Sequence, residues 1–245
     1  MKCENLQCNN YYVMRILFIL MLICLPVFAG NYNIYRSGNV PDMSEDERVL
    51  FILDFSNSMS EYLNGERKVD LMIDTMKSIL PNLNPNVSVG LRVYGHRMGF
   101  TPMEACRAST LLSPVSRSNA MNIKESLASV KPRGMTPITY SLKQAVKNDF
   151  IGFSGKKHII LLTDGGENCD ESPCKYVMEL IKIRKDINID VIAFNIDDEE
   201  DLEQLECTSL VTSGKFYNAK TAADLIRSLN NSVNSFKSVD AKIIY

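Results

Sequence analysis

The chain has 245 residues, of which 45% are hydrophobic and 23% are charged, as is typical of a globular protein and unlike a fibrous or low-complexity chain. This length is enough for one large domain with a hydrophobic core. The formal net charge is -2, and lysine and arginine are scattered rather than clustered, which argues against nucleic acid as a partner.

The first thirty residues have the layout of a signal peptide. The apolar run Ile16–Phe28 follows Arg15 and leads to an Ala-Gly pair. Met14 directly precedes Arg15, so the chain starts at either Met1 or Met14. An uncleaved membrane anchor is the alternative, because a spanning helix needs about 17 to 25 apolar residues and this run is near the lower limit.

Residues 31–47 are polar and are predicted to form a linker to the first strand. Beyond them, apolar runs alternate with helical periods. The strand candidates are Val49–Leu53, Val87–Val93, Thr110–Leu112, His158–Leu162, Ile189–Phe194 and Lys215–Tyr217. An apolar helical period over 69–80 predicts a helix that ends at Pro81, and a second helix is predicted to start at Ser118 with Met121, Leu127 and Val130 facing inward. Thr136 and Ser172 are each followed by proline and are predicted to cap two more helices. Asp198 and Thr221 are predicted to cap the last two.

This alternation predicts an α/β fold: a doubly wound, mostly parallel six-stranded sheet with helices on both faces. Thr110–Leu112 follows Val87–Val93 with no helix between them, so it is expected to be a short antiparallel edge strand. In such sheets, ligands bind beyond the carboxyl ends of the strands, where the strand order reverses.

Three loops at strand ends or helix starts carry oxygen-bearing side chains. The first has Asp54, Ser56 and Ser58 at alternate positions, the second has Thr136, and the third has Asp164 after another apolar run. If the strands that end at Asp54 and Asp164 are neighbours, their carboxylates face each other and require a cation between them. Carboxylates and hydroxyls suit Mg²⁺, with Mn²⁺ or Ca²⁺ possible. Alone, each motif is more typical of a cap or turn; the prediction depends on all three together.

These residues, in this order, resemble the metal-ion-dependent adhesion site of von Willebrand factor type A (vWA) domains. The resemblance covers about 48–236, within a domain predicted over 48–240, and "LRVYGHR", "RGMTPI" and "LLTDGGENCDESPC" resemble the exported bacterial branch. It implies that Ser56 and Ser58 bind the metal directly. Thr136, Asp54 and Asp164 are implied to bind directly or through water, and one position stays open for an acidic side chain of a partner.

The resemblance implies a protein-binding module rather than an enzyme. A partner protein would present a Glu or Asp to the metal, and the domain would act outside the cytoplasm: in the periplasm, at the cell surface or secreted. Two alternatives are a metal-assisted hydrolase and a membrane-anchored accessory subunit of an envelope complex. The motifs include no general base or phosphate-binding loop, which disfavours the hydrolase.

Cysteine usage is consistent with export. Three of the seven cysteines lie in the predicted signal segment, which leaves an even number for disulfides. The spacing is poor for zinc. Three pairings are possible; we expect Cys106–Cys169 and Cys174–Cys207, the last two on helices expected to be neighbours, with a local Cys169–Cys174 bridge as the alternative.

Overall fold

The computed structural model describes residues 47–84 and 86–235. The predicted signal peptide or anchor and nearly all of the predicted linker lie outside the described residues, so these assignments stay predictions. In the described part, no helix is long and apolar enough to cross a membrane.

A six-stranded sheet forms the centre of the domain, in the order β5-β4-β1-β6-β7-β8. All neighbouring pairs are parallel except β4 and β5, which are antiparallel. The strands are β1 (Arg48–Asp54), β4 (Ser88–Tyr94), β5 (Ser109–Ser116), β6 (Lys157–Thr163), β7 (Ile187–Phe194) and β8 (Phe216–Ala219); a separate two-stranded hairpin joins β2 (Tyr62–Leu63) and β3 (Glu66–Arg67). The predicted sheet and its antiparallel edge are confirmed, although the edge strand is longer than expected.

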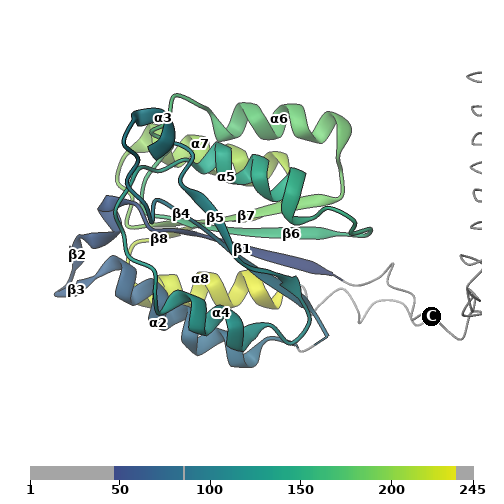
Figure 1. Ribbon diagram of the computed structural model, residues 1–245, viewed down its shortest axis with the longest axis horizontal. Helices are drawn as coiled ribbons and strands as arrows, with labels where there is room; N and C mark the ends of the chain where they lie inside the picture. The colour runs from purple at the N-terminus through teal and green to yellow at the C-terminus, as the bar shows by residue number, and fades with distance from the viewer. Residues whose placement is uncertain (1–46, 85, 236–245) are drawn as a thin grey trace, which may run out of the picture. The chain divides into compact units, whose positions relative to one another are not determined.

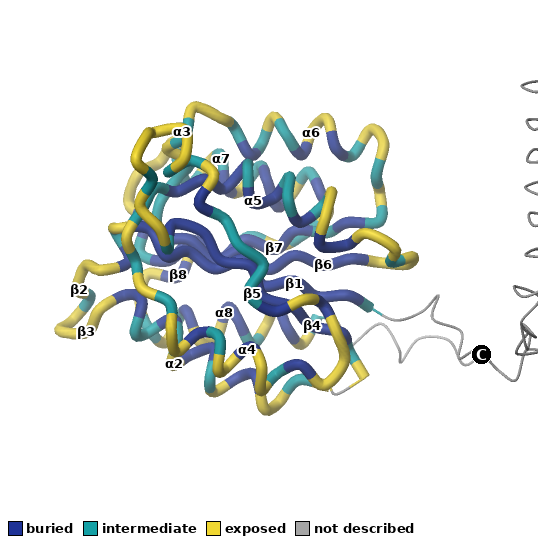
Figure 2. Tube along the Cα trace, in the orientation of Figure 1, coloured by how far each residue is buried: buried dark blue, intermediate teal, exposed yellow. Residues whose placement is uncertain are grey.

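Helices cover both faces of the sheet, as Figure 1 shows. One face packs against α2 (Lys68–Ile79), α4 (Ala120–Leu127) and α8 (Ala222–Asn234); the other packs against α5 (Ile138–Gln144), α6 (Pro173–Ile183) and α7 (Glu199–Val211). The short elements are η2 (Asn57–Ser60), η3 (Leu80–Asn82), α3 (Pro102–Ala105) and the π-helical turn η4 (Ala145–Asp149). The central strands are buried throughout because helices lie over both of their faces (Figure 2).

Three of the predicted caps form. The side chains of Ser172, Asp198 and Thr221 each accept a hydrogen bond from a backbone N–H in the first turn of α6, α7 and α8, and Thr221 is part of a capping box. Thr136 is not a cap, because α5 begins one residue later than expected, with Pro137 at the N-cap position.

The prediction of a helix that starts at Ser118 is wrong about its first residue and about one residue of its inward face. α4 begins at Ala120, and Ile123 and Leu127 set its buried face. Met121 lies two residues from Ile123, which is about 200° around a helix, so it points to solvent and is 62% exposed. Hydrophobicity alone could not exclude Met121 from the inward face.

A buried ion pair joins β4 to η4, the turn that follows α5. Arg92 Nε and a terminal guanidinium nitrogen donate to the two carboxylate oxygens of Asp149, at 2.6 and 2.7 Å, and both side chains are buried. This bidentate geometry compensates for the loss of water around each charge.

Replacing Asp149 by Ala should lower the free energy of unfolding by about 3–5 kcal/mol, because it leaves the Arg92 guanidinium buried without its charge partner. Urea denaturation measures the change. The double variant Arg92→Leu/Asp149→Leu should be less destabilised than the single one; equal or greater destabilisation would contradict this account.

Candidate functional site at the carboxyl ends of β1 and β6

Asp54 is the last residue of β1, and its carboxylate is fully buried. One oxygen accepts a hydrogen bond from the backbone N–H of Ser56 at 2.6 Å. The other accepts from the Tyr94 hydroxyl at 3.0 Å and from the Thr163 hydroxyl at 2.8 Å. Because Tyr94 and Thr163 end the two strands that flank β1, three adjacent strands fix the position of this carboxylate.

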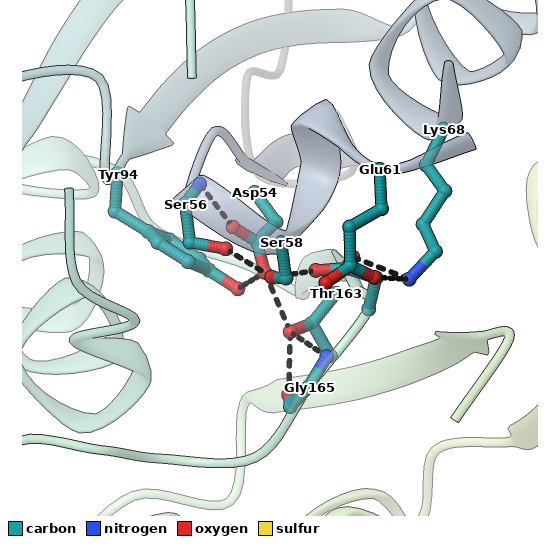
Figure 3. A network of polar contacts seen from close by, with 9 residues as sticks. Asp54, Ser56, Ser58, Glu61, Lys68, Tyr94, Thr163 and Gly165 are labelled. Carbon is teal, nitrogen blue, oxygen red and sulfur yellow. Dashed lines mark hydrogen bonds and ion pairs between the residues drawn. The ribbon is translucent and has the colours of Figure 1, made fainter. Parts of the chain in front are cut away.

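The side chains of Ser56 and Ser58 lie next to each other (Figure 3). Together with Asp164 they form a continuous chain of side-chain contacts. The Ser56 and Ser58 hydroxyl oxygens are 3.0 Å apart, and the Ser58 hydroxyl donates to one carboxylate oxygen of Asp164 at 2.7 Å. The structure therefore brings four of the five predicted ligands, Asp54 included, to one edge of the sheet. β1 and β6 are neighbours, as the argument from the sequence required.

Lys68, the first residue of α2, reaches into this cluster (Figure 3). Its ammonium donates to the second carboxylate oxygen of Asp164 at 3.1 Å and to Glu61 at 2.9 Å. The Lys68 side chain is 7% exposed, whereas the Glu61 side chain is 66% exposed. Asp164 thus has one oxygen turned toward the serines and the other engaged by an internal cation.

Thr136 is buried in a loop that is connected to both of the other loops. Gly134 forms a parallel bridge with Ser56, and its carbonyl accepts from the Asn57 N–H at 3.0 Å. The Thr136 N–H donates to the Asn168 side chain at 2.7 Å, four residues beyond Asp164. These backbone contacts place the threonine loop against the two loops that carry the carboxylates and serines.

Gly95, just after β4, explains how the loops approach so closely. Its φ is +69°, a conformation that favours glycine, and a Cβ there would collide with the backbone of Ser56 and the carbonyl of Met135. A larger residue at this position would push apart the loops that carry Ser56 and Thr136.

The surroundings of the two carboxylates disfavour their ionised forms. Burial and, to a lesser extent, the nearby charge of Asp164 raise the pKa of Asp54 from 3.8 to about 7, against hydrogen bonds from Ser56 and Thr163 that lower it. Burial also raises the pKa of Asp164, although Ser58 and Lys68 act against this shift. Burial lowers the pKa of Lys68, but its bonds to Glu61 and Asp164 raise it by more, so the ammonium stays charged at neutral pH.

The donor atoms of the site are those that a hard cation accepts. Two carboxylates and the serine hydroxyls supply only oxygen, and burial raises the pKa of both carboxylates, so added positive charge would stabilise their ionised form. Among the described residues there is no cluster of three or more His, Cys, Asp or Glu side chains, so a metal here depends on hydroxyl ligands as well. The residues fit a divalent cation of the magnesium type.

Two disulfides stiffen this side of the domain. Cys106, after α3, is bonded to Cys169, five residues beyond Asp164, and Cys174 of α6 is bonded to Cys207 of α7. These are the two expected pairings, which are therefore confirmed, and the local Cys169–Cys174 alternative is not formed. The first bridge ties the segment between β4 and β5 to the Asp164 loop, and bridges of this kind contribute about 2–4 kcal/mol each.

The comparison with protein families identifies the domain. A family model described as von Willebrand factor type A domain matches residues 49–232. The chain belongs to this family. The resemblance noted from Asp54, Ser56 and Ser58 is therefore confirmed at the level of the vWA family.

Several proteins are similar to this vWA chain. The uncharacterized protein YwmD of Bacillus subtilis strain 168 is 28% identical over 199 residues, covering 78% of this chain and 87% of YwmD. Proximal thread matrix protein 1 from the mussel byssus, solved with a zinc-occupied MIDAS motif, has a TM-score of 0.60 at 21% identity, covering 80% of this chain and 46% of the mussel protein. The vWF domain of the pilus tip protein Mfa5 of Porphyromonas gingivalis has a TM-score of 0.58 at 14% identity, covering 79% of this chain and 96% of the Mfa5 domain chain.

At these identities the solved structures show a shared vWA fold. The chain spans less than half of the mussel protein, so that protein's other properties carry no information about this one.

Sequence reasoning missed four residues of the site: Glu61, Lys68, Tyr94 and Thr163. Thr163 could have been found, because it directly precedes Asp164 at the end of an apolar strand. Lys68 and Glu61 are seven residues apart and belong to no recognisable motif. Only the hairpin of β2 and β3, which turns the chain back, places them together.

Replacing Lys68 by Met should destabilise the metal-free protein by about 3 kcal/mol, because the buried Asp164 carboxylate loses its charge partner. Denaturation in EDTA measures the effect. Lys77→Met, on the same helix, removes only an exposed pair with Asp74 and should cost less than about 1 kcal/mol. Equal effects of the two substitutions would contradict a charge-neutralising role of Lys68.

The contribution of Asp54 to the stability of the metal-free protein should decrease as pH rises from about 4 to 7. Folded Asp54 keeps its proton up to about pH 7, whereas the unfolded chain releases it near 3.8, so the stabilisation is complete below that value and is lost as pH rises through 7. Burial lowers the pKa of His96 from 6.5 to about 4. The contribution of His96 to stability therefore increases with pH between these two values, opposite to that of Asp54.

Urea denaturation in EDTA at several pH values, with Asp54→Asn as the matched variant, separates the two contributions. The variant should lack the decrease assigned to Asp54. Identical pH profiles of wild type and Asp54→Asn would show that the assignment is wrong.

Proposed function

We propose that the domain is an exported, metal-dependent protein-binding module. Asp54, Ser56, Ser58, Thr136 and Asp164 hold a divalent cation, and a Glu or Asp of a partner protein completes its coordination. The observation that carries this proposal is the contact chain from Ser56 through Ser58 to Asp164, next to buried Asp54, at the carboxyl ends of two adjacent strands. Mg²⁺ is the proposed metal, because hydroxyls and carboxylates are its preferred protein ligands.

The similar proteins support this proposal. One solved neighbour has zinc in its MIDAS motif, and others are described as pilus adhesins or pilus tip proteins. Adhesion is thus a described role of one such neighbour, and the metal dependence proposed here rests on the oxygen donors of the site.

Export is supported by the two disulfides, which form and persist in oxidising compartments. The predicted signal segment Ile16–Phe28 is consistent with the same location.

We propose a non-enzymatic role because the polar atoms of the site are engaged with one another. Asp54 accepts three hydrogen bonds, and Asp164 accepts from Ser58 and Lys68. A general base must have an accessible atom for the proton that it takes up. Hydrolysis of a phosphate ester that disappears in Asp54→Ala would favour the hydrolase alternative instead.

Affinity capture of partners from the envelope fraction, in Mg²⁺ and in EDTA, tests the proposal. Wild type should retain partners only in Mg²⁺. The double variant Ser56→Ala/Ser58→Ala should bind Mg²⁺ at least tenfold more weakly than wild type, because it lacks two of the proposed ligands. Calorimetric titration measures the metal affinity directly. The serine variant keeps both carboxylates and Lys68 in place, so loss of binding reports on the ligands rather than on folding.

The control is Asp74→Ala, which removes an exposed carboxylate of α2 and should leave metal and partner binding unchanged. Lys68→Met should bind Mg²⁺ more tightly than wild type, because the metal no longer competes with the ammonium for Asp164. Partner capture that is equal in Mg²⁺ and EDTA would contradict the proposed function.

A further inference from the structure

A second candidate site lies at the opposite end of the domain, at the amino ends of the strands. An open groove of about 830 Å³ is bordered by η4, the loop before β6, and the segment from the end of α6 to the start of β7. Figure 1 shows these loops at the far end of the sheet from α3 and the β2–β3 hairpin. The groove is therefore separate from the proposed metal site.

The groove is strongly basic in a chain whose net charge is -2. Five of its lining residues are cationic, and Asp186 is the one acidic residue among the described residues that line it. Asp186 is already engaged, because Arg184 donates to both of its oxygens at 2.7 and 2.8 Å and Lys157 donates at 2.7 Å. The cationic residues are Lys147, Lys156, Lys157, Arg184 and Lys185.

Three of these cations, Lys147, Lys156 and Lys185, are exposed. They lie on three different segments, so the positive charge surrounds the groove rather than following one helix. No acidic lining residue in the described part of the chain is left to neutralise them. The groove can therefore attract a negatively charged surface.

Apolar side chains accompany this charge. Ile151 is 76% exposed on the loop before β6, and Ile183 is 81% exposed at the end of α6. Figure 2 shows both of these segments as exposed parts of the trace. Large aliphatic side chains exposed beside lysines are typical of surfaces that meet a bilayer, where the apolar tips enter the interface and the cations face anionic headgroups.

The chain enters the domain at this same end. The N–H of Arg48 donates to the carbonyl of Lys156 at 3.3 Å, and its guanidinium lies over the Phe153 ring, 4.9 Å from the centroid. Residues 29–46 separate the apolar segment Ile16–Phe28 from the described domain. At full extension they span at most about 60 Å, so an uncleaved segment would keep the domain close to the bilayer.

We propose that this face, defined by Lys147, Ile151, Lys156, Ile183 and Lys185, binds an anionic phospholipid surface. The domain would then lie on the membrane with the proposed metal edge directed away from it, toward a partner. The inference does not depend on the metal site, since it involves none of its residues. We assign a lipid surface because the exposed aliphatic tips lie beside lysines on an open groove, at the end where the chain enters the domain. An acidic protein segment is the alternative that the test below separates.

Lysine acetylation of the full chain with a membrane-impermeant reagent tests this proposal. Vesicles of phosphatidylglycerol and phosphatidylcholine in equal parts should protect Lys147, Lys156 and Lys185, whereas vesicles of phosphatidylcholine alone should not. The internal controls are Lys124, Lys175 and Lys220, which are exposed outside the groove and should react equally in both samples. High salt should remove the protection by screening. Because each lysine is compared between vesicle types, the readout holds whether or not the N-terminal segment inserts.

Substitutions sharpen the test. Replacing Lys147, Lys156 and Lys185 by Gln should reduce the preference for anionic over neutral vesicles about fivefold per lysine, about a hundredfold in total. The matched variant with Gln at 124, 175 and 220 should keep that preference, and Ile151→Ser/Ile183→Ser should weaken the lysine protection. Thermal melts check that each variant folds.

The proposal is overturned if anionic and neutral vesicles give equal protection, or if the groove and control variants behave alike. It is also overturned if poly-glutamate protects the groove lysines and the vesicles do not, because the face would then bind acidic protein.

Discussion

The site depends on one electrostatic constraint: two carboxylates are buried side by side at the carboxyl ends of neighbouring parallel strands. Parallel pairing of β1 with β6 brings Asp54 and Asp164 to the same edge, and burial raises the pKa of both. Like charges in a dry environment are stable only when a proton or a cation compensates them. The serine loop, the threonine loop and Lys68 all gather around this pair, and the proposed metal would satisfy the same need.

Lys68 gives the metal-free domain a partial substitute for the cation. Its ammonium engages one oxygen of Asp164 and is steadied by Glu61, while Asp54 remains uncompensated with a pKa of about 7. The two buried carboxylates are thus only partly compensated, which favours added positive charge at the site. Lys68 binds one oxygen of Asp164, and the other oxygen accepts from Ser58. This arrangement leaves a single Asp164 oxygen on the serine side to contact the proposed metal.

The two ends of the sheet differ in chemistry. The carboxyl ends carry acids and hydroxyls, whereas the amino ends carry the basic groove with Ile151 and Ile183. A parallel sheet separates its two ends by the length of its strands, about 20 Å for seven residues, so the two sites can act on different surfaces at once. On the proposed reading, one end holds the domain at a membrane and the other presents the metal to a partner.

The sequence by itself determined the layered α/β architecture, three of the helix caps and the acid and hydroxyl positions of the site, because these depend on local periodicity and on short spacings such as Asp54 to Ser58. It misplaced Met121, since hydrophobicity does not fix the phase of a helix. Only the tertiary structure brought Lys68, Glu61, Tyr94 and Thr163 to Asp54 and Asp164 and gathered the scattered lysines around one groove. These features join residues that are distant in the sequence, and their proximity arises from strand order and packing, which no local pattern encodes.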